Sequence, residues 1–144
     1  MNKVTTEEII QFLKQETYEG KITSESDVFR EIGICGDDCD ELLHSFQEKY
    51  KVDMKEYLWY FHQEEEGSWN NIGSSFFKSP NERVKRIPIT PKILTDFANS
   101  KKWKIDYPEH KLPKNRYDLY INWLILIFLV ATIILVTYYY KPIL

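Results

Sequence analysis

Charge is absent from residues 119–140 of this chain, which contain no Asp, Glu, Lys or Arg. A helix of these 22 residues is about 33 Å long, because each residue adds about 1.5 Å, and the hydrocarbon core of a bilayer is about 30 Å thick. Between Trp123 and Val136 apolar residues surround the helix on all sides, unlike the single stripe of a helix packed on a soluble core. The missing charge therefore predicts a single transmembrane helix over residues 119–140.

Motifs that carry enzyme chemistry are also missing. The sequence has no Gly-rich phosphate-binding loop and no nucleophile elbow, and context singles out no pair of its many carboxylates for acid–base work. We therefore expect no enzyme.

The span also lacks the pattern by which transmembrane helices pair closely. Its single alanine, Ala131, has no second small residue four positions away, so we expect a monomeric anchor. The first residues, Met1–Glu8, lack an apolar run, so we expect no signal peptide.

Aromatic and basic residues flank the span and predict its orientation. Aromatic rings that favour the membrane interface precede and follow it at Tyr117, Tyr120, Trp123, Tyr138, Tyr139 and Tyr140. Six basic residues lie between Lys101 and Arg116, whereas only Lys141 follows the span. The positive-inside rule then places the N-terminal domain in the cytoplasm and residues 141–144 outside as a short tail. Because the cytoplasm is reducing, we expect no stable disulfide between Cys35 and Cys39.

Charge is unevenly divided over the rest of the chain. Residues 1–66 carry 7 Lys and Arg against 17 Asp and Glu, whereas residues 67–117 carry 11 against 4. This distribution favours a protein whose basic juxtamembrane connector, residues 101–118, contacts the head groups of an anionic leaflet while the acidic domain is held away from them. We expect no nucleic-acid partner, because the basic part is the one nearest the membrane.

Apolar periodicity predicts a mostly α-helical domain over residues 1–100. The spacing of Thr5 and Glu8 predicts a capped helix from about residue 6 to 16, and Thr90-Pro91 opens another. Between them, a helix begins after Gly36 with Asp37 or Asp38 as N-cap and runs to about residue 50. Its inward stripe is Cys39, Leu42, Leu43, Phe46 and Tyr50. Residues 52–88 have no assigned state, apart from a loop or hairpin insertion at 67–81 that exposes Trp69, Phe76 and Phe77.

From Ile22 to Met54 the sequence resembles an acyl carrier protein. Val28-Phe29-Arg30-Glu31-Ile32-Gly33 looks like the Phe-x-Glu-Asp-Leu-Gly signature, and Glu41-Leu42-Leu43 with Phe46-Gln47-Glu48-Lys49-Tyr50 looks like the second carrier helix. Gly36-Asp37-Asp38-Cys39-Asp40-Glu41-Leu42-Leu43, Val52-Asp53, Tyr60-Phe61 and Trp103 more closely resemble an uncharacterised bacterial family of acyl-carrier-like proteins. The resemblance implies a small carrier-like helical bundle, here held at a bacterial inner membrane.

The resemblance fails at the residue that carries the prosthetic group. A working carrier links phosphopantetheine to the serine of Asp-Ser-Leu, and those positions here are Cys35, Gly36 and Asp37. Gly36 has no side chain to modify, so we expect no cofactor. An alternative is a divergent carrier in lipid or secondary-metabolite synthesis, loaded at a non-standard residue such as Cys35 or Ser26. The other nearby hydroxyl, that of Ser45, lies about two turns inside the helix and therefore away from its entrance, where carriers hold the prosthetic group.

Carriers present acidic residues on their second helix to basic partners, and the resemblance implies the same surface here. We name this surface the acidic face; its residues are Asp37, Asp38, Asp40, Glu41, His44 and Glu48. The leading hypothesis is therefore a membrane-anchored interaction module for a protein partner with a basic surface. Another alternative is a small membrane accessory protein that acts through its anchor.

No metal site is expected. The acidic cluster lacks the alternating ligands, central glycine and late glutamate of a calcium-binding loop. The spacing of Cys35, Cys39 and His44, with His62 further on, is irregular for structural zinc.

Overall fold

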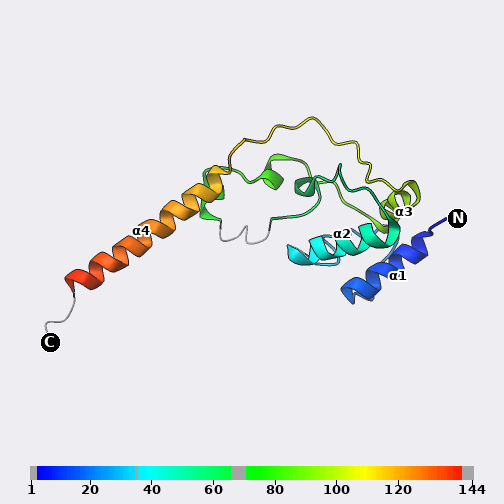
Figure 1. Cartoon of the computed structure of the whole chain (residues 1–144), viewed down its shortest axis with the longest axis horizontal. Helices are drawn as coiled ribbons and strands as arrows, with labels where there is room; N and C mark the ends of the chain where they lie inside the picture. The colour runs from blue at the N-terminus through cyan, green and yellow to red at the C-terminus, as the bar shows by residue number, and fades with distance from the viewer. Residues whose placement is uncertain (1–2, 35, 66–70, 141–144) are drawn as a thin grey trace.

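The computed structural model describes residues 3–34, 36–65 and 71–140, and it confirms a mostly helical protein (Figure 1). The longer helices are α1 (Thr6–Thr17), α2 (Asp37–Tyr50), α3 (Pro91–Ser100) and α4 (Tyr117–Tyr139). Short 3-10 helices lie between α2 and α3: η1 (Trp59–Phe61), η3 (Ile72–Ser75) and η4 (Pro80–Arg83). No β-strand forms within the described ranges. The predictions for Cys35, Trp69 and the tail at 141–144 fall outside the described residues.

Side-chain caps begin two of the helices where the sequence predicts them. The hydroxyl of Thr5 accepts a hydrogen bond from the Glu8 N–H at 3.2 Å, and the hydroxyl of Thr90 accepts one from the Ile93 N–H at 3.3 Å. Each cap satisfies an N–H group that has no partner inside the helix. Pro91 follows Thr90 as the first helical residue, where its lack of an N–H costs nothing.

The start of α2 differs from the prediction. Gly36, and neither Asp37 nor Asp38, is the N-cap, and no side chain caps this helix. Gly36 has φ 55° and ψ −129°, a conformation that only glycine adopts without strain. The two aspartates instead lie in the first turn, where their charge is favourable beside the positive end of the helix dipole.

One apolar core unites α1, α2 and α3. All five predicted inward residues of α2 are buried, which confirms the stripe. The ring of Phe12 on α1 lies 6.2 Å from that of Phe46 and 5.6 Å from that of Tyr50. Trp103 is 1% exposed and packs 4.6 Å from Phe97, so the core extends past the predicted boundary at residue 100. We call residues 3–105 the head.

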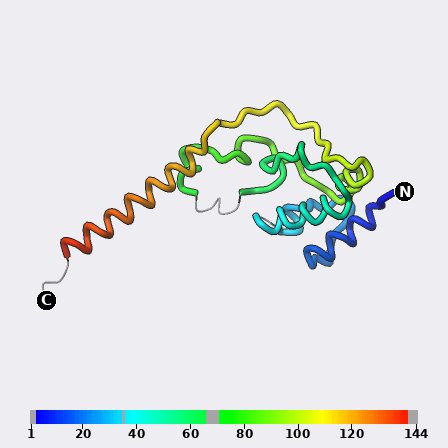
Figure 2. The backbone as a smooth tube through the Cα atoms, in the orientation of Figure 1, coloured from blue at the N-terminus to red at the C-terminus, as the bar shows by residue number. Residues whose placement is uncertain are grey.

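The described residues between α2 and α3 form turns and 3-10 helices, and the connector holds the first of these turns in place. Asp53 donates its N–H to the Lys101 carbonyl and accepts from the Trp103 N–H, both at 2.9 Å. Further along, the connector passes over the head before it reaches α4 (Figure 2). The hydroxyl of Tyr60 lies 2.7 Å from Nε2 of His110. The basic connector is therefore packed against the head for part of its length.

α4 extends away from the head as a single rod, and η3 contacts its first turns (Figure 1). It begins two residues before the predicted start at 119 and is long and apolar enough to cross a membrane. None of its most apolar stretch is buried against the rest of the chain. Length and composition thus agree with the predicted span.

Candidate functional site

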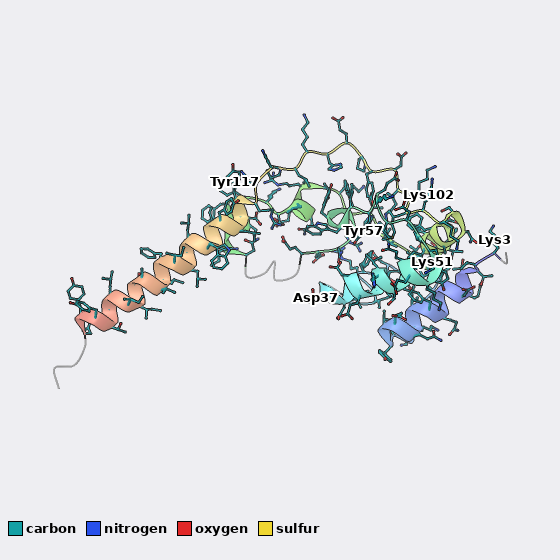
Figure 3. All side chains as sticks on the ribbon, viewed as in Figure 1. Lys3, Asp37, Lys51, Tyr57, Lys102 and Tyr117 are labelled. Atoms are coloured by element: carbon teal, nitrogen blue, oxygen red, sulfur yellow. The ribbon has the colours of Figure 1, made fainter. Side chains whose placement is uncertain are left out.

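The acidic face is exposed on α2. All six of its residues are exposed, while the inward stripe of the same helix is buried. Nε2 of His44 lies 3.5 Å from a carboxylate oxygen of Glu48, one turn along the same helix. Figure 3 shows Asp37 at the end of α2 nearer α4 and Lys51 at the opposite end. The structure therefore brings the six predicted residues together on one outward surface.

A cleft of about 330 Å³ lies beside the start of α2. Its walls combine carboxylates with aromatic rings: Gly36, Asp37, Asp40, Tyr57, Trp59, Gln63, Glu64 and Glu65. Carboxylates attract a cation, and the faces of Trp and Tyr rings add cation–π attraction. The cleft thus extends the acidic face with Asp37 and Asp40 beside the rings of Tyr57 and Trp59, groups that attract a Lys or Arg side chain. Sequence reasoning missed Glu64 and Glu65, whose partners lie far along the chain: Glu64 pairs with Arg30 at 3.0 Å, and the half-buried Glu65 pairs with Arg116 at 2.8 Å.

Among the described residues, no serine or threonine lies at the entrance of α2. Ser26 is buried, accepts a hydrogen bond from the Thr23 N–H at 3.1 Å and lies 3.0 Å from the Thr23 hydroxyl. Ser45 is half-buried within α2, beyond its first turns. At the carrier-serine position, a serine would also have to adopt the positive φ of Gly36. These residues do not fit a phosphopantetheine attachment site.

His62 has a structural role in the head. It is fully buried, and its Nδ1 donates to the Ile87 carbonyl at 2.9 Å while its Nε2 accepts from the Tyr107 hydroxyl at 2.8 Å. Burial lowers the pKa of His62 to about 4, only partly opposed by the bond to Ile87, so the ring is neutral at pH 7. Both ring nitrogens are occupied, which leaves neither for a metal.

The described residues contain no group of three or more His, Cys, Asp and Glu placed to hold a metal ion. Cys39 is buried on the inner side of α2, and its thiol donates to the Ile34 carbonyl at 3.2 Å. It therefore packs as a core residue, apart from His44 on the exposed side of the same helix.

A nearly buried ion pair was not predicted from the sequence. Asp27 accepts two hydrogen bonds from the Arg86 guanidinium, one of them 2.7 Å long. Burial alone raises the pKa of Asp27, but the guanidinium and the N–H groups of Arg30 and Phe29 outweigh it and lower the pKa below its usual value. The pair ties the loop before α2 to the segment before α3. Its partners are 59 positions apart, and no local pattern links them.

A second unpredicted cluster joins the head to the base of α4. Asp118 is 2% exposed and accepts hydrogen bonds from Arg116 at 2.6 Å and from the Asn71 side chain at 3.0 Å. Arg116 also binds Glu65 at 2.8 Å. Of the predicted interface aromatics, Tyr117 packs in a tilted arrangement with its ring centre 5.5 Å from that of Phe77. All six predicted aromatics are exposed; they are Tyr117, Tyr120, Trp123, Tyr138, Tyr139 and Tyr140.

Residues 2–106 match the family described as Protein of unknown function (DUF1493), and the chain belongs to that family. The match covers the head and ends before α4. No curated protein and no solved structure matches the chain.

Proposed function

We propose that this protein is a non-enzymatic interaction module, anchored in a membrane by α4, which presents the acidic face of α2 to a protein partner with a basic surface. The observation that carries the proposal is the exposure of all six polar residues on one side of a helix whose other side is core. Carriers use the same arrangement for docking, and the acyl-carrier likeness of the head is part of this hypothesis.

The position of the acidic face supports a partner at the membrane. The start of α2 lies on the side of the head from which α4 departs (Figure 3), so a protein bound there would lie beside the anchor. Complementary charge accelerates such encounters and excludes partners of the same sign. The aromatic cleft next to Gly36 adds a place for one basic side chain of the partner.

The predicted topology places the head on the cytoplasmic side of a bacterial inner membrane, with residues 141–144 outside. This orientation is supported by the distribution of basic residues, because six Lys and Arg lie at residues 101–116, before α4, and only Lys141 follows it. A reporter fused to the N-terminus should score as cytoplasmic and one fused to the C-terminus as external. The reverse pattern would refute the orientation while leaving the anchor intact.

A module of this kind works without a prosthetic group. Gly36 offers no hydroxyl, and Ser26, one of the two alternative sites beside Cys35, is buried and bonded to Thr23. The intact mass of the protein should stay unchanged after coexpression with a phosphopantetheinyl transferase that loads an ordinary carrier. A mass increase equal to phosphopantetheine would favour the divergent-carrier alternative.

Site-specific crosslinking in native membranes tests the partner surface. A photoreactive amino acid at position 44 should give a discrete adduct, and Asp40→Lys with Glu41→Lys should reduce its yield by about tenfold, because like charges then meet across the contact. The matched control is Glu16→Lys with Glu25→Lys, which changes the charge equally at exposed sites outside α2. If both double variants lose the adduct equally, net charge rather than the acidic face controls binding.

A further inference from the structure

The loop at residues 71–77 exposes large apolar side chains at the base of α4. Ile72 is 55% exposed, Phe76 69% and Phe77 42%. Three such residues in one short loop form an apolar patch, of the kind that marks a contact site on soluble proteins. Residues 71–79 also contain no acidic residue and one lysine, Lys78. Charge therefore does not oppose contact between this loop and an anionic surface.

Hydrogen bonds fix the loop at a defined height on α4. The Gly73 N–H donates to the side-chain oxygen of Asn122 at 2.8 Å, and the Asn122 amide donates to the Asn71 side chain at 2.7 Å. The Asn71 amide in turn donates to Asp118 at 3.0 Å. Asp118 and Asn122 are one helical turn apart, so the loop is hydrogen-bonded to two successive turns at the start of α4.

The backbones of the loop and the helix are in close contact at Gly73. A Cβ atom at this position would lie 1.9 Å from the carbonyl oxygen of Asp118, far inside van der Waals contact. Only glycine permits this approach. The loop is therefore seated on the helix by its backbone as well as by side chains.

The height of the loop on α4 determines its distance from lipid. After Asn122, the part of α4 that contains neither charge nor a side-chain amide, residues 123–139, rises about 25 Å, somewhat less than a hydrocarbon core of about 27–30 Å. A run of this length has to begin at the membrane boundary in order to cross. Asn122 then lies in the headgroup layer, which is roughly 5–7 Å thick on each side. A loop bonded to Asn122 shares that layer.

We infer that the loop at residues 71–77 is a second membrane contact, which inserts Ile72, Phe76 and Phe77 into the interfacial layer of the leaflet that α4 enters. This inference rests on the proposed anchoring by α4. The occupant is lipid rather than protein, because the patch is continuous with the aromatic start of the span through the tilted contact between the rings of Phe77 and Tyr117. Insertion at a second point would set the orientation of the head relative to the membrane, and with it that of the acidic face.

Nitroxide labels on the full chain in phosphatidylethanolamine–phosphatidylglycerol vesicles test the inference. Phe76→Cys, Trp123→Cys and Tyr18→Cys are labelled singly in a Cys35→Ser, Cys39→Ala background whose helical circular dichroism matches the wild type. Tyr18 is 92% exposed on the head and reports on water, whereas Trp123 reports on the span. The ratio of collisions with oxygen to those with a water-soluble nickel complex should be several-fold higher at 76 than at 18, and similar to that at 123.

The three labels separate the failure of this inference from that of the anchor. If the label at position 123 has the same low collision ratio as the label at position 18, α4 does not enter the bilayer and the proposed anchoring fails. If the label at position 123 is in lipid but the label at position 76 is in water, the anchoring by α4 is supported and the loop contact is refuted. If 76 is shielded from both reagents, protein covers it and the lipid assignment is wrong.

Gly73→Ala tests whether the seat on α4 places the loop. The added Cβ should displace the loop, so the collision ratio at 76 should fall while that at 123 stays constant. Gly20→Ala is the matched control, because no atom lies within 4 Å of the added Cβ. If Gly73→Ala leaves the ratio at 76 unchanged and high, the loop contacts lipid without its close approach to Asp118, and docking on α4 does not set its height.

Discussion

α2 and α4 are both regular helices, yet they present opposite surfaces to their surroundings. α2 buries one apolar stripe in the head and exposes the acidic face, whereas α4 is apolar all round and exposed along most of its length. Phe46 on α2 is 1% exposed, and Phe128 on α4 is 70% exposed. The distribution of apolar residues thus separates the two helices: α2 has one side suited to a core and one suited to water, whereas α4, beyond its contact with η3, has the all-round apolar surface that crossing a membrane requires.

The same comparison explains where each helix gains its stability. Burial of a phenylalanine contributes about 1.5–3 kcal/mol, and for Phe46 the head itself provides that burial. α4 buries little apolar surface against the chain, so its apolar side chains gain no comparable stabilisation from the head. The head should therefore fold without α4, whereas burial of α4 would have to come from another apolar environment, such as the proposed membrane.

Removal of α4 should have the largest effect. A chain truncated after Lys114 should move entirely from the membrane fraction to the soluble fraction, because it loses the uncharged span and retains a head with its own core. Ultracentrifugation after carbonate extraction measures the partition. If high salt alone releases the full-length protein, its attachment is electrostatic and α4 does not span the bilayer.

Phenylalanine truncation compares the two helices directly. Phe46→Ala should lower the free energy of unfolding of the head by about 3–5 kcal/mol, because it leaves a cavity among α1 and α2 side chains. Phe128→Ala is the control and should leave the unfolding of the head unchanged, since Phe128 does not belong to the core. Denaturant unfolding in detergent, followed by near-UV circular dichroism, measures both. Equal losses would mean that α4 packs on the head.

Local sequence patterns predict most of the helical framework. The caps at Thr5 and Thr90 occur where spacing predicts them, and the inward stripe of α2 is recovered residue for residue. These features depend on neighbours within one or two turns, so a single sequence is sufficient. Exposure of Phe76 and Phe77 is likewise confirmed.

Contacts between distant segments could not be predicted. The partners in the pairs Asp27–Arg86 and Asn71–Asp118 are 59 and 47 positions apart, and each pair depends on how the chain folds back. The N-cap of α2 was missed for a different reason: aspartates are common caps, and the positive φ of Gly36 leaves no sign in the residues around it. The partner and the acyl-carrier likeness stay predictions.

Acid should weaken the head through His62. Burial lowers its pKa to about 4 from 6.5, so the unfolded chain takes up a proton at a higher pH than the folded one. Stability is therefore full above pH 6.5, falls as the pH decreases towards 4, and levels off below. Between pH 7 and pH 5 the loss should be about 2 kcal/mol. Urea unfolding at both values measures it.

His62→Gln should remove most of this acid loss, because its amide does not titrate, although the variant starts from a lower stability at pH 7. His44→Gln is the matched control: His44 lies exposed on the acidic face, and its replacement should keep the wild-type loss. If His62→Gln shows the full acid loss, other groups are responsible for it.

The smallest effect on folding should come from reversing charge on the acidic face. Asp40→Lys with Glu41→Lys should change the free energy of unfolding by less than about 1 kcal/mol, because both side chains are exposed, and Asp37 and Asp38 still face the helix dipole. Urea unfolding beside the Glu16→Lys, Glu25→Lys control measures the change. A loss as large as that of Phe46→Ala would mean that the acidic face stabilises the head, and the crosslinking result at position 44 would then report unfolding instead of lost contact. A folded variant that still forms the adduct would exclude the acidic face as the partner surface. With folding preserved and the adduct lost, the two sides of α2 have separate roles: its apolar stripe stabilises the head and its acidic face binds.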